Sequence, residues 1–162
     1  MDKSSLLRLI IAHLDAELAR YASSARAAHE EATHEQSKAE NKYDTRGLEA
    51  SYLARGQSRQ AQETLEAREE FARMQPRTFS EDAPIDLGAL VELTLEPAGE
   101  TARYFICPRA GGTEVEYEGQ TLLVITPQSP LGRLLVGRKA GESVRLEARR
   151  EGRITYRIRA IA

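Results

Sequence analysis

The 162-residue sequence has a single cysteine, Cys107, and therefore cannot form an internal disulfide framework. No apolar run approaches the roughly 20 residues that a membrane-spanning helix needs. Neither charge is in excess, because 23 Lys and Arg oppose 25 Asp and Glu for a net charge of -2, so no overall basic surplus attracts nucleic acid or a membrane surface. These absences predict a cytoplasmic protein that does not contact membranes and that meets RNA or DNA only indirectly or locally.

Proline is also absent from residues 1–75, which hold only two glycines and are rich in Ala, Glu, Leu, Arg and Gln. These residue types favour helix, so this half is expected to be helical throughout. Residues 76–84 (PRTFSEDAP) are polar, are bounded by two prolines and are expected to form a linker. From residue 85 to residue 162, Val, Ile and Thr become frequent and glycines recur at turn spacing, which indicates a domain made mostly of strands.

Two seams of apolar or small residues recur at helical spacing in the first half. The first comprises Leu7, Ile11, Leu14, Leu18, Tyr21, Ala25, Ala28 and Ala32. The second comprises Tyr43, Gly47, Ala50, Ala54, Gln57, Ala61, Leu65 and Ala72, interrupted by Arg68. Because the chain supplies both seams, residues 1–75 are predicted to form an antiparallel coiled-coil hairpin, which favours a monomer. An ordinary dimerising coiled coil is the alternative.

The hairpin turn is expected near residues 33–37, where Ser37 and Glu40 fit the capping box of a restarting helix. Helices of about 30 residues rise roughly 45 Å at 1.5 Å per residue, which exceeds the diameter of a small domain. The hairpin is therefore expected to project from the rest of the protein. Small residues near the turn should let the helices approach closely, and such a slender finger suits insertion into a channel of a partner.

In the second half, Val91, Leu93 and Leu95 alternate with polar residues, and the segments 102–107, 121–126, 143–148 and 154–161 are further strand candidates. The pattern predicts a small antiparallel sheet with one covering helix. That helix has its own signals in SPLGRLLVGRKAG (129–141): Ser129 as the N-cap, Pro130 in the first turn, and Gly137 at the end in a left-handed conformation. Its apolar stripe is Leu131, Leu134 and Leu135. Cys107 lies in an apolar strand-like run and is expected to be buried and inert.

The motif SPLGRLLVGRKAG resembles the C-terminal signature of bacterial Gre-type transcript cleavage factors, and SKAENKY (37–43) resembles their acidic tip. The likeness covers essentially the whole chain. It implies an FKBP-like C-terminal domain that docks on bacterial RNA polymerase at the rim of its secondary channel, while the coiled coil enters the channel. It also implies that the tip carboxylates help bind a second Mg²⁺, which activates water to cleave the 3' end of backtracked RNA in the active site of the polymerase. The chain would then be an auxiliary factor, not an enzyme, with no cofactor of its own.

The resemblance assigns polymerase docking to the helix and the turn that follows it. The residues concerned are Ser129, Pro130, Leu131, Arg133, Gly137, Arg138 and Lys139. The alternative for Arg133, Arg138 and Lys139 is an ordinary solvated surface.

The tip departs from the pattern of the family, which is Asp-x-x-Glu-Asn followed closely by Tyr. Glu40, Asn41 and Tyr43 match, but the first acidic position is Ser37. Asp44 lies one helical turn beyond Glu40 and could restore the second carboxylate, because i and i+4 share a face. Glu40 and Asp44 are therefore the candidate Mg²⁺ ligands, in complex with the polymerase only. Alternatively, Glu40 completes the capping box and Asp44 is a favourable charge near a helix N-terminus.

Three functions remain open at this point. The first is stimulation of transcript cleavage through the tip carboxylates. The second is a non-cleaving regulator that occupies the same channel and acts by occlusion, which the serine at position 37 favours. The third is an unrelated scaffold or a prolyl-isomerase-like module, for which the aromatic side chains of the strands, among them Tyr104 and Tyr156, would form the pocket. Aromatics on half-buried strands belong more often to the core.

Overall fold

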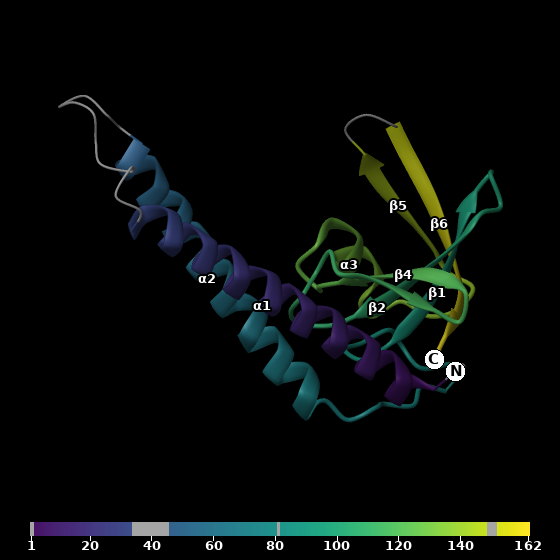
Figure 1. Cartoon of the computed structure of the whole chain (residues 1–162). Coiled ribbons are helices and arrows are strands. Elements are labelled where there is room, and N and C mark those ends of the chain that lie inside the picture. The colour runs from purple at the N-terminus through teal and green to yellow at the C-terminus, as the bar shows by residue number, and fades with distance from the viewer. Residues whose placement is uncertain (1, 34–45, 81, 149–151) are drawn as a thin grey trace. The chain divides into compact units, whose positions relative to one another are not determined.

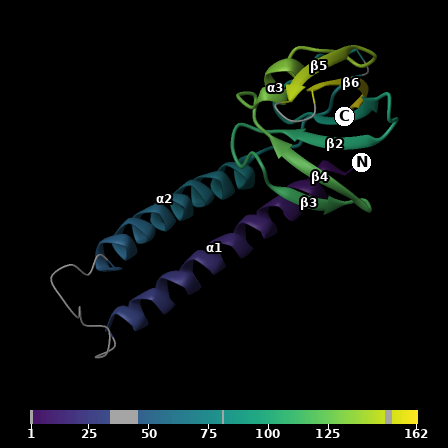
Figure 2. The same cartoon turned by 90° about the horizontal axis from the view of Figure 1, so that it is seen from above.

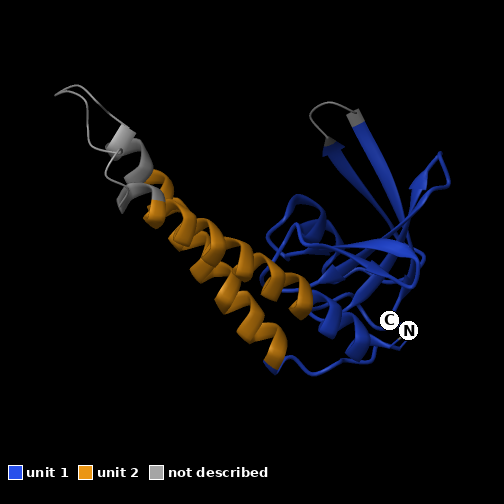
Figure 3. Cartoon of the chain, in the orientation of Figure 1, with its two compact units in different colours: residues 1–10, 73–162 blue, residues 11–72 orange. Residues whose placement is uncertain are grey.

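A computed structural model describes residues 2–33, 46–80, 82–148 and 152–162 (Figure 1). Two compact units are present: residues 11–72 form one, and residues 1–10 together with 73–162 form the other (Figure 3). The elements in chain order are α1 (Lys3–Thr33), α2 (Arg46–Arg73), β1 (Leu90–Glu96), β2 (Thr101–Ile106), β3 (Glu114–Tyr117), β4 (Gln120–Ile125), α3 (Pro130–Leu135), β5 (Ser143–Ala148) and β6 (Gly152–Ile161).

Residues 11–72 form the helical unit, and the prediction of two long helices is confirmed. Both views of the chain show α1 and α2 running alongside each other (Figures 1 and 2). The guanidinium Nε of Arg68 donates a hydrogen bond of 2.9 Å to Oδ1 of Asp15, which links the two helices. None of the helices among the described residues combines the length and apolarity needed to cross a membrane.

The buried stripe of α2 differs from the second predicted seam. Leu65 is 40% exposed and Ala72 is exposed, whereas Thr64, Ala67 and Phe71 are buried. The second seam was predicted from the recurrence of small and apolar residues, and it left out Phe71, the large aromatic side chain near the end of α2. Since Thr64, Ala67 and Phe71 are three and four residues apart, they share one face of the helix. The seam is therefore rotated by about one residue from its predicted position.

The second unit contains a six-stranded sheet in the order β3-β4-β2-β1-β6-β5. The predicted strands and covering helix are present, but the sheet is mixed, and the prediction of a wholly antiparallel sheet is wrong. Strands β2 and β4 pair in parallel, with Arg103 opposite Leu122 and Phe105 opposite Val124. The physical reason is that the chain runs back along the sheet edge as β3 after it leaves β2, and then turns into β4, which lies between β3 and β2 and has the direction of β2. The β3 segment thus serves as the crossover that a parallel pair requires.

One face of this sheet carries the main core of the unit. Val91 and Leu93 of β1, Tyr156 and Ile158 of β6, and Val144 of β5 are buried in a single cluster. Successive side chains of a strand point to opposite faces, so this set defines one face. Helix α3 covers it, because Leu131 and Leu135 belong to the same cluster.

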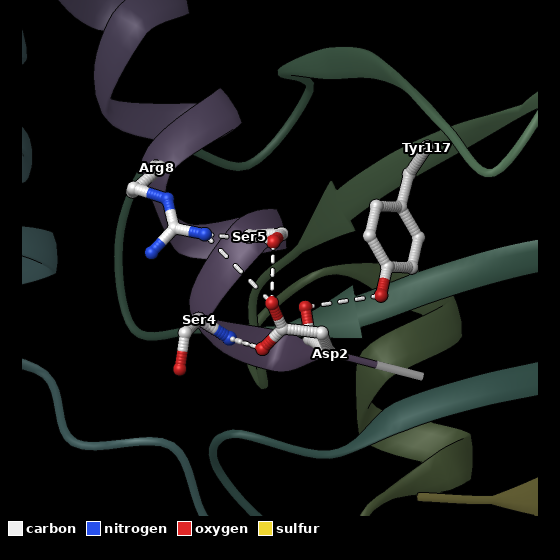
Figure 4. Close-up of polar contacts among 5 residues, drawn as sticks. All are labelled: Asp2, Ser4, Ser5, Arg8 and Tyr117. Atoms are coloured by element: carbon white, nitrogen blue, oxygen red, sulfur yellow. Dashed lines mark hydrogen bonds and ion pairs between the residues drawn. The ribbon is translucent and has the colours of Figure 1, made fainter.

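The first turn of α1 is fixed to the same unit by the backbone and side chain of Asp2 (Figure 4). Its Oδ1 accepts from the backbone N–H of Ser4 at 3.0 Å, and its Oδ2 accepts from the Ser5 hydroxyl. These are N-capping contacts, and the Ser5 hydrogen bond is the main reason why the pKa of Asp2 is lowered. The Tyr117 hydroxyl of β3 donates to the backbone oxygen of Asp2 at 3.0 Å, which ties the helix start to the sheet.

The segment predicted to be a linker packs closely around Lys3. The ammonium group of Lys3 donates hydrogen bonds to the backbone oxygens of Arg77 and of Gly88, the latter at 2.8 Å. It also lies 4.6 Å from the ring centroid of Phe79. Burial lowers the pKa of Lys3 from 10.5 to about 8, and the charge of Arg77 contributes. Residues 77–79 are thus held by specific contacts despite their polar, proline-bounded sequence.

Candidate functional site

The N-terminus of α3 has the cap that the sequence predicts. Ser129 is in an extended conformation (φ -64°, ψ 155°), and its Oγ accepts a hydrogen bond of 3.0 Å from the backbone N–H of Gly132. The same hydroxyl donates to the backbone oxygen of Thr126 at 2.8 Å. Pro130 occupies the first turn, where its missing N–H costs no hydrogen bond. Ser129 therefore joins the helix to the end of β4 as well as capping it.

Gly132 is a second determinant of this junction, and the sequence analysis did not identify it. A Cβ atom at this position would lie 2.0 Å from the backbone oxygen of Thr126 and 2.9 Å from Ser129 Oγ. No other residue type allows the helix to approach the preceding loop so closely. The available signal was a glycine inside a helical pattern, which suggests close backbone approach.

The C-terminus of α3 is fixed by backbone contacts to the segment before β1. Gly137 has φ +83°, as predicted, and its N–H donates to the oxygen of Ile85 at 2.8 Å. The N–H of Ile85 donates in turn to the oxygen of Arg138 at 2.8 Å. Leu131 and Leu135 are buried and Leu134 is half-buried, so the predicted apolar stripe is confirmed. The helix is consequently held at both ends and along one side.

Four residues at the outer side of this helix and its following turn are exposed, and we call them the α3 face: Arg133, Val136, Arg138 and Lys139. The three cations are those that the sequence analysis singled out, whereas Val136, which is 40% exposed, was not predicted. Arginine is among the residue types that are enriched in protein–protein interfaces, so Arg133 and Arg138 suit such a role.

Glu142 organises the cationic turn of the α3 face. Its Oε1 accepts from the backbone N–H of Lys139 at 2.9 Å, and its Oε2 accepts from Arg138 Nη1 at 3.1 Å. The Lys139 hydrogen bond, followed by that of Arg138, holds the pKa of Glu142 below its usual range. Because Glu142 already neutralises part of the charge of Arg138, Arg133 and Lys139 are the cations most available to an acidic partner.

The predicted tip residues Ser37, Glu40, Asn41, Tyr43 and Asp44 lie outside the described residues, and so do the capping box and residues 34–37 of the predicted turn. Among the residues that are described, no group of three or more His, Cys, Asp or Glu side chains is arranged to hold a metal ion. The predicted Mg²⁺ ligands therefore stay a prediction.

The distal helices do not approach each other as closely as their small residues predict. An apolar groove of about 500 Å³ remains between α1 and α2, because alanine side chains are too short to fill the space between the helices. It is lined by Leu18, Tyr21, Ala22, Ala25, Ala28, His29, Ala54, Gln57, Ser58 and Ala61.

Cys107 and the two strand tyrosines lie where the sequence analysis expected them. Cys107 is fully buried, with its sulfur 4.0 Å from that of Met74. Tyr156 is buried in the core. Tyr104 packs against the same core and interacts with Tyr156, and burial is the main cause that raises the pKa of Tyr104 to about 12.

The family described as "Transcription elongation factor, GreA/GreB, C-term" has a sequence model that matches residues 81–162. Among solved structures, the chain is similar to GreA factor homolog 1 (Gfh1) of Thermus thermophilus, with 21% identity over 96% of this chain and 94% of that one and a TM-score of 0.41. Gfh1 of Thermus aquaticus is 22% identical over 95% and 94%, with a TM-score of 0.42. A GreA/GreB elongation factor from Nitrosomonas europaea is 18% identical over 61% and 78%, with a TM-score of 0.40. No curated protein sequence matches the chain.

Proposed function

Since the chain belongs to the GreA/GreB family of transcription elongation factors, we propose that it binds bacterial RNA polymerase at the secondary channel and stimulates cleavage of backtracked RNA. Factors of this family are auxiliary to the polymerase and are not themselves enzymes. The proposal places docking in the sheet unit and assistance to catalysis at the tip of the hairpin.

The observation that carries the docking proposal is the fixed geometry of the α3 face. Ser129, Gly132 and Gly137 fix the helix at both ends, so little backbone conformational entropy remains to be lost when a partner binds. Arg133 and Lys139 are exposed on either side of Val136. This arrangement suits a partner surface that combines acidic residues with an apolar contact, and we assign that partner as the polymerase.

For the tip, we propose that Glu40 and Asp44 donate carboxylate oxygens to a Mg²⁺ ion that the polymerase holds in its own active site. Hard oxygen ligands suit Mg²⁺, and one or two carboxylates suffice when a partner supplies the remaining ligands. When bound, such a metal would activate water for hydrolysis of the RNA. The chain itself would bind no cofactor away from the polymerase and would act as a monomer.

One sequence observation favours a second candidate function. Ser37 stands where the tip pattern has an acidic residue, so half of the expected carboxylate pair is missing. A factor with this tip could occupy the secondary channel and regulate transcription by occlusion without cleaving RNA. The two candidates share the docking site and differ only in the chemistry of the tip.

Stalled elongation complexes with 3'-backtracked, end-labelled RNA distinguish these candidates. Shortening of the RNA on addition of the purified chain supports cleavage stimulation. Binding to the polymerase without shortening supports occlusion. Failure of the chain to bind the polymerase contradicts both.

A further inference from the structure

The last two strands carry a charge distribution that sets them apart from the rest of the chain. Residues 143–162 contain six arginines and two glutamates, with no lysine or aspartate, although the chain as a whole has a net charge of -2. A concentrated basic segment in a slightly acidic chain indicates a local interaction with an anionic partner.

Alternation along the strands places the described arginines on one face. In β6, Tyr156 and Ile158 are buried, whereas the arginines that alternate with them are exposed. In β5, Val144 is buried and its neighbour Arg145 is exposed. Since α3 covers the face that contains Tyr156 and Val144, the arginines lie on the opposite face of the sheet. We call this set the arginine strip: Arg145, Arg153, Arg157 and Arg159.

Two members of the strip have carboxylate partners. Arg153 Nε lies 3.5 Å from Glu147 Oε1, and Arg159 Nη1 lies 3.1 Å from Glu92 Oε1. Both arginines remain largely exposed, so these ion pairs contribute little stability and leave guanidinium donors open to an incoming anion.

The other two members, Arg145 and Arg157, pair with no carboxylate in the part of the chain that the structure describes. Arg145 stands opposite Thr155, two residues from Arg157, so the two arginines are diagonal neighbours on one face. The exposed Glu96 of β1 also stands opposite Thr155, on the other side of β6 from Arg145. Arg145 and Arg157 therefore present two adjacent guanidinium groups that an external anion can bridge.

We propose that the arginine strip binds the phosphodiester backbone of nucleic acid, an activity beyond the proposed docking and cleavage. The planar guanidinium fork matches the phosphate group and donates two hydrogen bonds to it. Tyr156, the aromatic residue of β6, is buried on the opposite face, so it offers no platform for stacking of bases. Recognition is therefore through phosphates and independent of base sequence.

The positions of the α3 face and the arginine strip are compatible with binding of polymerase and nucleic acid at the same time. The α3 face and the arginine strip belong to the same unit and lie on opposite sides of one sheet. Docking through the α3 face therefore does not itself use the residues of the strip. The strip could then hold a nucleic-acid strand of the transcription complex while the chain is docked.

The test is fluorescence anisotropy with the full chain and a labelled DNA duplex over a series of KCl concentrations, with labelled single-stranded RNA in a second series. Each phosphate contact contributes about 0.9 to the slope of log K against log salt for duplex DNA and about 0.7 for a single strand. The double variant Arg145→Gln/Arg157→Gln should therefore lose about 2 from the slope on duplex DNA. Arg145→Lys/Arg157→Lys keeps the charges and should keep most of the slope.

The matched control is Arg133→Gln/Lys139→Gln, which removes the same charge from the opposite face and should retain the wild-type slope. An equal loss of slope in this control overturns the proposal, because it would reflect net charge alone. Equal affinity of the wild type and the Arg145→Gln/Arg157→Gln variant for nucleic acid also overturns the proposal. So does binding of polyglutamate by the wild type as tightly as DNA of equal charge, because that result would indicate an acidic protein partner. Polymerase binding by the control variant tests only the docking proposal. Docking through the α3 face and nucleic-acid binding by the arginine strip can therefore be contradicted independently.

Discussion

A Cβ atom on Gly132 would lie only 2.0 Å from the backbone oxygen of Thr126, so the position of α3 depends on the absence of a side chain there. We predict that Gly132→Ala lowers the free energy of unfolding by about 3 kcal/mol, because the atom in contact is backbone and cannot move aside as a flexible side chain can. Urea unfolding monitored by circular dichroism measures the change. The control is Gly56→Ala in α2, where a Cβ atom meets nothing within 4 Å and should stabilise the chain by about 0.5–1 kcal/mol. Equal effects of the two substitutions would show that the contact with Thr126 has no energetic weight.

The corrected stripe of α2 gives a second prediction. Phe71→Ala should destabilise the chain by about 3–5 kcal/mol, because it removes a buried aromatic side chain and leaves a cavity. Leu65→Ala should change stability by about 0.5 kcal/mol or less, because Leu65 is 40% exposed. Thermal unfolding of both variants under the same conditions compares their losses of stability. A larger loss for Leu65→Ala would restore the seam that the sequence pattern predicts.

Because the pKa of Lys3 is lowered in the folded chain, we expect the free energy of unfolding to depend on pH. Its pKa is about 8 in the folded chain against an ordinary value of 10.5, so above pH 8 the unfolded chain binds more protons than the folded one. The free energy of unfolding should therefore increase as the pH rises from 8 towards 10. Above pH 10 the raised pKa of Tyr104 acts in the opposite direction, because the unfolded chain then loses a proton that the folded chain keeps.

Urea unfolding at intervals between pH 8 and pH 10 tests this dependence, with Lys3→Met as the comparison. The wild type should gain stability relative to the variant across this range. Parallel curves for the two proteins would mean that Lys3 titrates at the same pH in the folded and unfolded states.

The α3 face predicts a defined effect on polymerase binding. Arg133→Gln/Lys139→Gln should weaken binding to core RNA polymerase and reduce its dependence on salt, because two exposed cations are lost. Arg145→Gln/Arg157→Gln removes the same charge from the other face and should bind the polymerase as the wild type does. Surface plasmon resonance at two salt concentrations compares the three proteins. Equal weakening in both variants would contradict docking through the α3 face.

The local features of the fold could be predicted because their causes are local. Ser129, Pro130 and Gly137 act within one helical turn of their own positions, and the structure has all three in their predicted roles. The absence of proline from residues 1–75, together with their many helix-favouring residues, likewise predicts the long helices. The family match also excludes the unrelated scaffold that the sequence analysis left open.

The features that could not be predicted depend on contacts between distant parts of the chain. The parallel pairing of β2 with β4 depends on the path of the chain through β3, which alternation within a strand does not encode. The contacts of Lys3 with Arg77 and Gly88 span more than 70 residues, so a polar, proline-bounded segment gives no sign of them. The choice between Leu65 and Phe71 depends on the rotation of α2, which small residues on both sides of the helix leave undetermined.

If the tip carboxylates assist the polymerase in cleaving backtracked RNA, the Glu40→Ala/Asp44→Ala variant should lose this stimulation. Stalled elongation complexes are mixed with the wild type or the variant, and RNA length and polymerase affinity are measured on the same samples. The RNA should be shortened when the wild type is present, whereas the variant should bind the polymerase with nearly unchanged affinity and leave the RNA intact. Undiminished shortening with the variant, or binding of the wild type without any shortening, would show that the tip carboxylates do not assist cleavage.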